Sequence, residues 1–239
     1  MNVEYADAVE ENLANWSKGL WDKIPVGGLL ARSPVAHKWK APFRCMMLRE
    51  AAFWREHDLM KQSHMLFRAG HVLGARILLR SGFETLATLT FLNLLMQQVL
   101  DGALDFHAFG DKTTDLLLGA RNNEKMPKSI NVMTVLEKCD RRYPGLMELY
   151  ADLSESAHPS YEGLCSGYSK VDHDEYETVF SNRWMELRGD RHLDAMMLCM
   201  GTFHHEYDKV WPALFEQMEE WIVANDERLE ATKEAGASA

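Results

Sequence analysis

The sequence lacks a hydrophobic segment long enough to cross a membrane. Its longest uncharged run, Thr85 to Leu100, contains Thr, Asn and Gln and falls short of the ~20 apolar residues that span a bilayer. The N-terminus is acidic and amphipathic, unlike a secretory signal peptide. We therefore expect a cytoplasmic protein with no membrane partner, and we place Thr85–Leu100 in a buried helix.

Cysteines are few and dispersed. The sequence has four of them, none in a Cys-x-x-Cys pair: Cys45, Cys139, Cys165 and Cys199. We expect reduced thiols, which agrees with a cytoplasmic location. The Gly-x-Ser-x-Gly, P-loop, Rossmann glycine and His-Glu-x-x-His motifs are also absent, so the sequence predicts no cofactor.

A metal site is not predicted either. Glu155 and His158 have the Glu-x-x-His spacing of diiron bundles, but the second copy that such sites need is missing. His204 and His205 are adjacent on a predicted helix, so their rings point about 100° apart and do not easily share a metal ion.

Acidic residues outnumber basic ones, 36 against 26, which gives a formal net charge of −10. This charge argues against nonspecific nucleic-acid binding by the overall field. Asp and Glu are nevertheless absent between Asp22 and Glu50. That window is a solvated connector that balances an acidic neighbour, or it contacts phosphate or RNA. It holds six basic and two aromatic residues, which are Lys23, Arg32, Lys38, Lys40, Arg44 and Arg49, with Trp39 and Phe43.

Apolar residues recur at three- and four-residue steps along most of the chain, which indicates α-helices. Pro159–Asn182 is rich in glycine, tyrosine and β-favouring residues and is predicted as a long loop or small hairpin. Pro212 must kink or restart the last helix. Helices are expected at 2–22, 43–68, 72–100, 106–118, 130–141, 145–157 and 190–229.

The chain has no internal repeat and no linker able to separate two domains. We therefore predict a single all-α domain over residues 1–239. An N-terminal helix and a connector occupy 1–42, a bundle occupies 43–230, and 231–239 is a frayed tail. The helix at 72–100 is the most apolar and is expected at the centre of the fold.

Three charged residues form a stripe on this apolar helix. Arg76, Arg80 and Glu84 lie at i, i+4 and i+8, so they share one face. A charge in a buried helix costs several kcal/mol unless it is paired and hydrogen-bonded. Two interpretations follow: the stripe faces a polar pocket that the segment around His158 completes, or it belongs to an interhelical ion-pair network.

His158 directly precedes Pro159. Because proline disfavours the α region for the residue before it, His158 is predicted to mark a helix end. A histidine with its backbone held there suits acid–base chemistry, and it equally suits a structural cap. Tyr161 and Tyr168 follow closely and would line a pocket at this place.

The helix Ala75-Arg-Ile-Leu-Leu-Arg-Ser-Gly-Phe-Glu-Thr-Leu-Ala, followed about seventy residues later by Leu-Ser-Glu-Ser-Ala-His-Pro, resembles a HEPN-like group of bacterial helical proteins. The resemblance covers residues 45–180. It implies an up-and-down helical bundle that forms a homodimer. It also implies metal-independent RNA cleavage or RNA binding in stress response or phage defence, with an antitoxin or defence protein as partner.

The sequence departs from this family at one position. Catalytic HEPN ribonucleases have an arginine separated by four to six residues from the histidine, and here those positions are Ala151, Asp152 and Leu153. The resemblance then assigns the general acid/base to His158 and the phosphate-binding cation to Arg80 or Arg76, with Glu84 orienting Arg80. The substrate contacts would come from Tyr161, Tyr168, Lys38, Lys40 and Arg44.

The missing arginine and the acidic charge favour a different function. In this alternative the protein is a non-enzymatic helical scaffold or regulatory partner, whose Arg–Glu–His cluster is structural. A small-molecule or metal enzyme that uses the same pocket is a third hypothesis.

Overall fold

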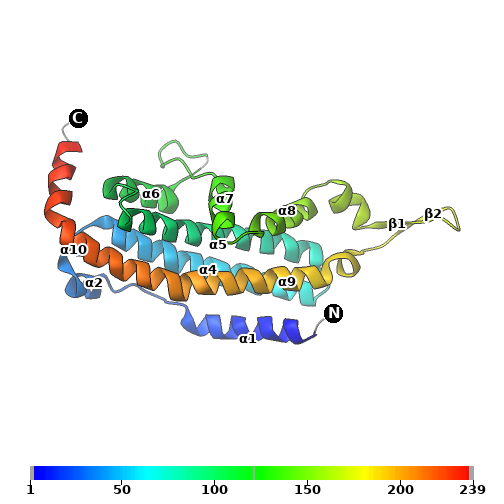
Figure 1. Cartoon of the computed structure of the whole chain (residues 1–239). Helices are drawn as coiled ribbons and strands as arrows, with labels where there is room; N and C mark the ends of the chain where they lie inside the picture. Colours follow the sequence, from blue (N-terminus) through cyan, green and yellow to red (C-terminus); the bar gives the residue numbers. More distant parts are fainter. Residues whose placement is uncertain (1–2, 121, 237–239) are drawn as a thin grey trace. The chain divides into compact units, whose positions relative to one another are not determined.

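A computed structural model describes residues 3–120 and 122–236 and is mostly helical (Figure 1), which confirms the all-α class. No helix within these residues is long and apolar enough to cross a membrane. The elements are α1 (Val3–Gly19), α2 (Val26–Arg32), α3 (Pro34–His37), α4 (Lys40–Arg68), α5 (Val72–Leu100), α6 (Phe106–Leu118), α7 (Val132–Arg142), α8 (Leu146–Ala157), the π-helical turn η1 (Tyr161–Ser166), β1 (Ser169–Asp172), β2 (Glu177–Phe180), α9 (Trp184–His205), the π-helical turn η2 (Glu206–Val210) and α10 (Trp211–Gly236).

The chain divides into two compact units that alternate along the sequence. Unit 1 comprises Met1–Leu20, Trp54–Leu86 and Leu136–Thr202, and unit 2 comprises Trp21–Phe53, Ala87–Val135 and Phe203–Ala239. Helices α4, α5, α7 and α9 therefore contribute residues to both units. A single domain over the whole chain stays a prediction.

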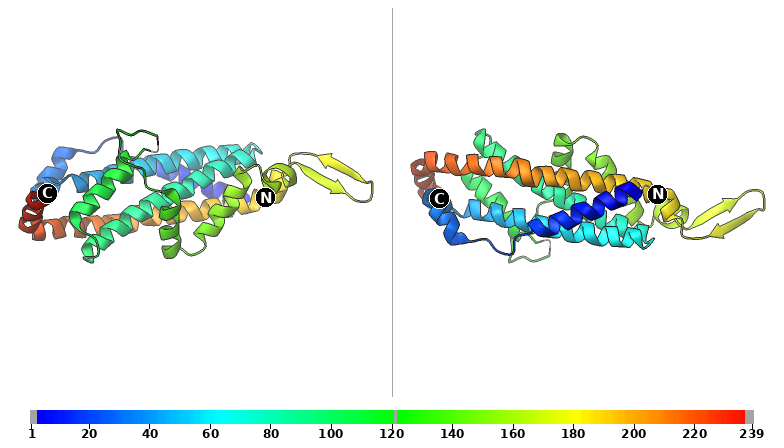
Figure 2. Two further views of the ribbon diagram at one scale, coloured as in Figure 1. Left: turned by 90° about the horizontal axis from the view of Figure 1, so that it is seen from above. Right: turned by 90° about the horizontal axis from the view of Figure 1, so that it is seen from below.

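The core of unit 1 is formed by α1, the second half of α4, the first half of α5, and α9. Figure 2 shows α1 alongside this part of α4. Burial of apolar side chains on these helices supplies the main stabilising free energy of the unit. One cluster of fully or almost fully buried residues joins all four helices: Ala6, Phe67, Val72, Ala75, Trp184 and Leu193.

Aromatic rings fill much of the core of unit 2. The Trp39 ring meets Phe106 edge-on at 5.5 Å between centroids, and Phe106 contacts Trp221 at 5.9 Å. Trp211 stacks on Phe215 at 4.3 Å. These contacts fix the start of α4 against α6 and α10, which positions the basic side chains described below.

Several predicted boundaries are confirmed. Helices α5 and α6 have the predicted ends, and Gly70 separates α4 from α5 with φ +82°, a left-handed conformation that suits glycine. His158 follows the last residue of α8 with φ −89° and ψ 148°, an extended backbone that confirms it as a helix end.

The predicted connector over 24–42 is partly wrong, because it contains two short helices. Pro34 stands at the first position of α3, where its missing N–H leaves no hydrogen bond unmade. Pro42 lies in the first turn of α4, which begins at Lys40 and so includes part of the predicted connector.

The last predicted helix is two helices joined by a π-helical turn. Pro212 cannot donate a backbone hydrogen bond, and α10 begins one residue before it, directly after η2. Residues 231–236 are helical, where a frayed tail was predicted, and residues 237–239 lie outside the described part of the chain.

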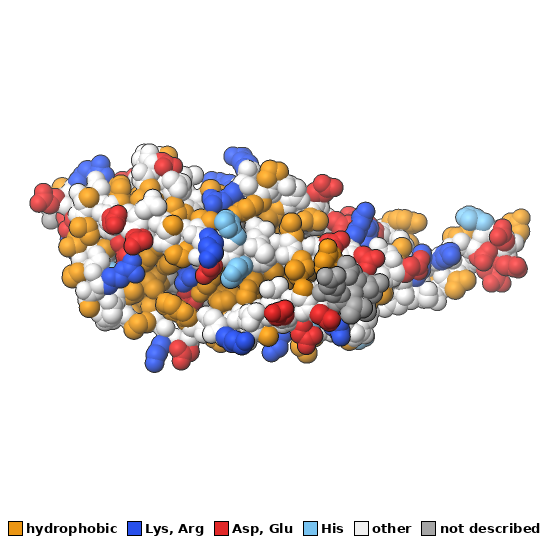
Figure 3. Space-filling model, turned by 60° about the horizontal axis from the view of Figure 1, so that its bottom comes forward, with side chains coloured by type: hydrophobic (Ala, Val, Ile, Leu, Met, Phe, Trp, Pro, Cys, Tyr) orange, Lys and Arg blue, Asp and Glu red, His pale blue; other side chains and the backbone are white. Residues whose placement is uncertain are grey.

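The predicted small hairpin is present in unit 1. Strands β1 and β2 pair antiparallel, with Ser169 opposite Phe180 and Asp172 opposite Glu177. Figure 2 shows the hairpin extending away from α8 and η1. The acidic side chains of its turn form a red cluster in the space-filling view (Figure 3).

Candidate functional site

Arg76 is fully buried in unit 1 and is held by helix α8. Its Nε donates to Ser156 Oγ at 2.8 Å, and its Nη2 donates to the Asp152 carboxylate at 2.6 Å and to the Asp152 carbonyl at 3.0 Å. Burial lowers the pKa of Arg76, and the hydrogen bond and charge of Asp152 oppose that shift. Its Nη1 is buried without a hydrogen-bond partner within the described residues, while Nε and Nη2 are held by α8. The side chain is fully buried, so the guanidinium is not exposed to solvent.

Arg80 lies one turn further along α5 and is held in the same way. Its Nε donates to Ser154 Oγ at 2.8 Å, its Nη1 pairs with Glu84 at 3.2 Å, and its Nη2 donates to the Tyr150 hydroxyl. Tyr150 in turn donates to Glu84 at 2.8 Å, and the pKa of Tyr150 is raised by burial and by Glu84. Arg80, Tyr150 and Glu84 thus form a closed triad.

A third arginine completes the network from helix α9. Arg188 pairs with Glu162 at 2.5 Å and with Asp152 at 3.6 Å, and Glu162 also accepts from Ser156 at 3.4 Å. These partners were not predicted from the sequence, because they belong to separate segments. Three cations and three carboxylates balance one another in this network, Arg76, Arg80 and Arg188 with Glu84, Asp152 and Glu162.

His158 lies two residues beyond Ser156 but is not part of this network. Its side chain is exposed, and its imidazole makes no hydrogen bond or ion pair within the described residues. Tyr161 is 80% exposed, and Tyr168 meets the edge of Trp184 at 6.3 Å. The structure therefore joins Arg76, Arg80 and Glu84 through α8 and leaves the three predicted aromatic and imidazole side chains outside the network.

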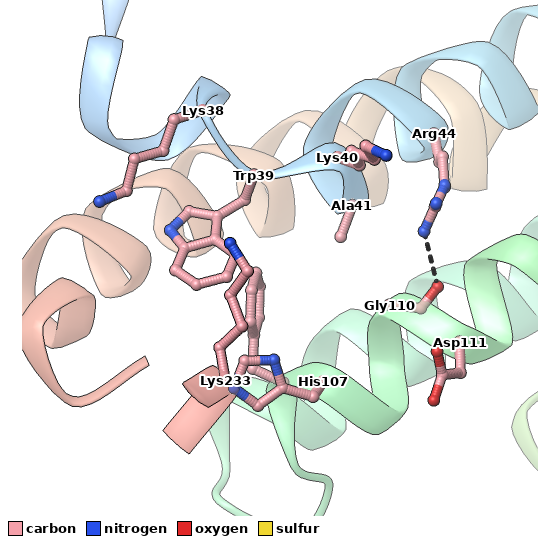
Figure 4. Close-up of a pocket in the computed structure, with 10 residues that line it drawn as sticks. Lys38, Trp39, Lys40, Ala41, Arg44, His107, Gly110, Asp111 and Lys233 are labelled. Atoms are coloured by element: carbon pink, nitrogen blue, oxygen red, sulfur yellow. Dashed lines mark hydrogen bonds between the residues drawn. The ribbon is translucent and has the colours of Figure 1, made fainter. Parts of the chain in front are cut away.

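The other predicted contact residues gather in unit 2. Lys38, Lys40 and Arg44 line a cavity of about 350 Å³ at the start of α4, and Trp39 forms part of its wall (Figure 4). His107 of α6 and Lys233 of α10 also line it, and neither was predicted from the sequence. Lys233 lies in the segment predicted as a frayed tail, where its polar neighbours gave no sign of packing.

The cations of this cavity differ in how far they are neutralised. Lys38 points away from Lys40 in Figure 4 and pairs with Asp226 at 2.6 Å and Glu230 at 2.9 Å, which raise its pKa. Arg44 donates to the Gly110 carbonyl at 3.0 Å, a neutral partner. Lys40 is exposed, and within the described residues it has no hydrogen bond or ion pair.

The backbone adds positive charge at the same place. Lys40 and Ala41 form the start of α4, a helix of 29 residues, and both line the cavity. The first-turn N–H groups of a helix have no intrahelical acceptor, and the helix dipole places partial positive charge there. An anion in the cavity would therefore meet Lys40, Arg44 and the end of the helix together, with Asp111 as the one carboxylate of the lining.

Comparison with known proteins assigns neither a family nor a function to this chain. No family model, no curated protein and no solved structure matches this chain. The likeness to HEPN proteins rests on the sequence motifs alone. Across residues 3–120 and 122–236, no group of three or more His, Cys, Asp or Glu side chains could hold a metal ion.

Proposed function

We propose that this protein binds RNA through the cavity at the start of α4, as a HEPN-like protein of stress response or phage defence. The supporting observation is that Lys40 and Arg44 have no carboxylate partner within the described residues, although the chain carries a net charge of −10. In such an acidic protein, an unneutralised pair of cations beside a helix N-terminus is a local anion site.

The geometry favours contact with phosphate over contact with bases. Lys40 and Arg44 lie at i and i+4 on α4, so both side chains reach one phosphate group or two adjacent ones. Trp39 is only 9% exposed, and its indole N–H donates to Asp226 at 3.0 Å, so its ring is not free to stack on a base. Binding is therefore expected to be insensitive to RNA sequence and sensitive to salt.

The experiment is fluorescence anisotropy with single-stranded RNA over a range of salt concentrations. Lys40→Gln and Arg44→Gln should each weaken binding and reduce the salt slope by about 1. The matched control is Lys23→Gln, which removes one charge from the same basic window outside this cavity. Equal affinities of Lys40→Gln, Arg44→Gln and Lys23→Gln would show that RNA does not bind at this cavity.

RNA cleavage at His158 is a further part of the hypothesis. The supporting observation is an exposed imidazole without a partner in the described residues, on a backbone fixed at the end of α8. His158 would act as general acid/base. Arg80 would supply the cation only after leaving Glu84 and Tyr150, since those side chains occupy its N–H groups.

The balanced network favours the second candidate function, a non-enzymatic scaffold or regulatory partner. Here Arg76, Arg80 and Glu84 fix the packing of α8 on α5, and the protein does not cut RNA. Incubating purified protein with total RNA separates the two candidates. Cleavage that both His158→Ala and Arg80→Ala abolish, while the two variants keep the wild-type melting temperature, would establish the nuclease.

The resemblance also extends the proposal to a homodimer and to an antitoxin or defence protein as partner. Light scattering of the purified chain measures the first. Copurification with the product of a neighbouring gene would test the antitoxin or defence partner. Substitutions on the surface that contacts this partner should reduce the amount that copurifies.

A further inference from the structure

A second cavity lies in unit 1, between α1 and the second half of α4. It has a volume of about 670 Å³. Helix α1 contributes Leu13 among others, and α4 contributes two histidines, two cations and Met65. Figures 1 and 2 show these two helices running side by side. The seven lining residues that bear on its chemistry are Glu10, Leu13, His57, Lys61, His64, Met65 and Arg68.

His64 is the unusual member of this set. It is only 6% exposed, and neither of its ring nitrogens has a hydrogen-bond partner within the described residues. Buried polar atoms are nearly always hydrogen-bonded, so an unpartnered imidazole in a cavity wall indicates a missing partner. The chemistry of the cavity therefore has to account for an imidazole with two unsatisfied nitrogens in its wall.

The cations in the cavity wall, Lys61 and Arg68, outnumber its one carboxylate, Glu10. Lys61 has no hydrogen bond or ion pair within the described residues. Arg68 approaches Asp7 at 3.9 Å, but both side chains are largely exposed, so this pair is weak. His57, Lys61, His64 and Arg68 recur at three- and four-residue steps and therefore share one face of α4.

The remaining wall is mainly apolar. Leu13 and Ala14 line the cavity from α1, Met65 lines it from α4, and Ala69 lines it just after the end of α4. Glu10 and Ser17 of α1 are its polar members. The Met65 side chain is 61% exposed, although it is large and hydrophobic. A hydrophobic surface with more cations than carboxylates around it matches a ligand that has an apolar body and a negative head.

We propose that this cavity binds a small amphipathic carboxylic acid. Its carboxylate lies between Lys61, Arg68 and the His64 ring, and its short hydrocarbon chain packs on Leu13 and Met65. A metal cation does not fit this set, since Lys61 and Arg68 would repel it. An inorganic anion would satisfy the charges and leave the apolar wall exposed to water.

Binding should be coupled to proton uptake. Burial is the main cause that lowers the pKa of both His57 and His64, and Lys61 and Arg68 lower them further. A bound carboxylate favours the imidazolium form, so it raises both pKa values and binds more tightly as the pH falls from 8 to 6. The other charged and titratable groups near the two rings are Asp7, Glu10, Asp58 and His192.

The test is isothermal titration calorimetry of the full chain with hexanoate, at pH 6 and pH 8. Hexanoate should bind saturably, at least threefold more tightly at pH 6. The comparison ligands are 1-hexanol, which keeps the hydrocarbon chain without the charge, and inorganic phosphate, which keeps the charge without the chain. Each should bind at least tenfold more weakly than hexanoate.

Variants locate the bound carboxylate. Lys61→Gln should weaken hexanoate binding about tenfold, and Lys170→Gln, an equal charge change on the exposed hairpin, should leave it unchanged. In the proton NMR spectrum, the His64 ring signal, assigned by its loss in His64→Gln, should titrate at higher pH when hexanoate is bound.

Four results would overturn the proposal: no saturable heat with hexanoate at pH 6, equal binding of hexanoate and 1-hexanol, phosphate binding as tight as hexanoate, or equal affinities of Lys61→Gln and Lys170→Gln. Equal affinities for hexanoate at pH 6 and pH 8 would show that binding is not coupled to proton uptake. Because no RNA is used, failure here is independent of the RNA-binding proposal.

Discussion

The thiol of Cys199 donates a hydrogen bond to a carboxyl oxygen of Glu56 at 3.3 Å, and both side chains are fully buried in unit 1. The second carboxyl oxygen, Oε2, has no hydrogen-bond partner within the described residues. Burial raises the pKa of Glu56 well above its ordinary value and is a stronger effect than the hydrogen bond and the nearby Arg55. Burial therefore favours the protonated form of the Glu56 carboxyl in the folded protein.

Glu56→Gln should stabilise the protein increasingly as the pH rises. The folded state holds a proton on Glu56 that the unfolded state releases above its ordinary pKa near 4.3, so wild-type stability declines with rising pH by about 1.4 kcal/mol per unit. Glutamine is neutral at every pH and removes this decline. Urea unfolding at pH 5 and pH 8 measures it, and an equal difference between variant and wild type at both values would contradict the prediction.

His192 should produce the opposite pH dependence. It is fully buried against Phe67, with ring centroids 5.2 Å apart, and its pKa is lowered to about 3 by burial, with Arg76 and His64 adding to the shift. In the unfolded state the His192 imidazole binds a proton with a pKa near 6.5, and in the folded state it stays neutral down to a much lower pH. Stability therefore falls as the pH drops from about 6.5, by up to about 1.4 kcal/mol per unit.

The measurement for His192 compares unfolding at pH 7 and pH 5. His192→Gln should lose part of the acid sensitivity of the wild type. His173→Gln, an equal change at an exposed position in the hairpin turn, should keep all of it. Acid sensitivity that is the same in both variants would mean that other groups control it.

A side chain at Gly82 of α5 would clash with the packed core. A Cβ atom at this position would lie 2.0 Å from Met60 Cε and 3.2 Å from the Glu56 carboxyl. The Met60 methyl ends a flexible side chain but is fully buried, so it would have to shift within the packed core. Gly82→Ala should therefore destabilise the protein by about 1–3 kcal/mol.

The matched control for Gly82 is Gly201, a glycine of α9 with no atom within 4 Å of an added Cβ. Gly201→Ala should raise stability by about 0.5–1 kcal/mol, because alanine restricts the unfolded chain and favours helix. Thermal unfolding of both variants checks the pair, and a shift of the same sign in both would contradict the packing argument.

Long helices could be predicted from the sequence, and short ones could not. Helix α5 has several turns of apolar periodicity and a glycine before it, so both of its ends were predicted. Helices α2 and α3 have seven and four residues, too few for periodicity to show against their glycines and prolines. Their sequences are typical of a connector, and only tertiary packing makes them helical.

The charged stripe on α5 could be found because its spacing is local, but its partners could not. Asp152, Glu162 and Arg188 lie on three segments, and one sequence does not indicate which charges meet across helices. One signal was present, since Asp152 and Ser156 are four residues apart and form a polar face on α8. This polar face favours the interpretation that Arg76 belongs to an interhelical ion-pair network over the interpretation that it faces a polar pocket.

Removing the Asp152 carboxylate tests that interpretation. Arg76 is 1% exposed at its side chain and Asp152 is 29% exposed, so Asp152→Asn would leave a buried guanidinium without its charged partner. The expected loss is at the lower end of about 3–5 kcal/mol, because solvent reaches one side of the pair. Asp194→Asn, an exposed position on α9 in the same unit, should change the free energy of unfolding by at most about 0.5 kcal/mol.

The double variant Asp152→Asn/Arg76→Met separates a lost ion pair from lost packing. If Arg76 has a structural function, replacing it together with its partner removes the uncompensated charge and recovers much of the stability lost in Asp152→Asn. If Arg76 contacts a substrate, the double variant regains stability and still loses activity on RNA. Urea unfolding and the RNA cleavage assay on the same preparations therefore distinguish a structural arginine from a catalytic one.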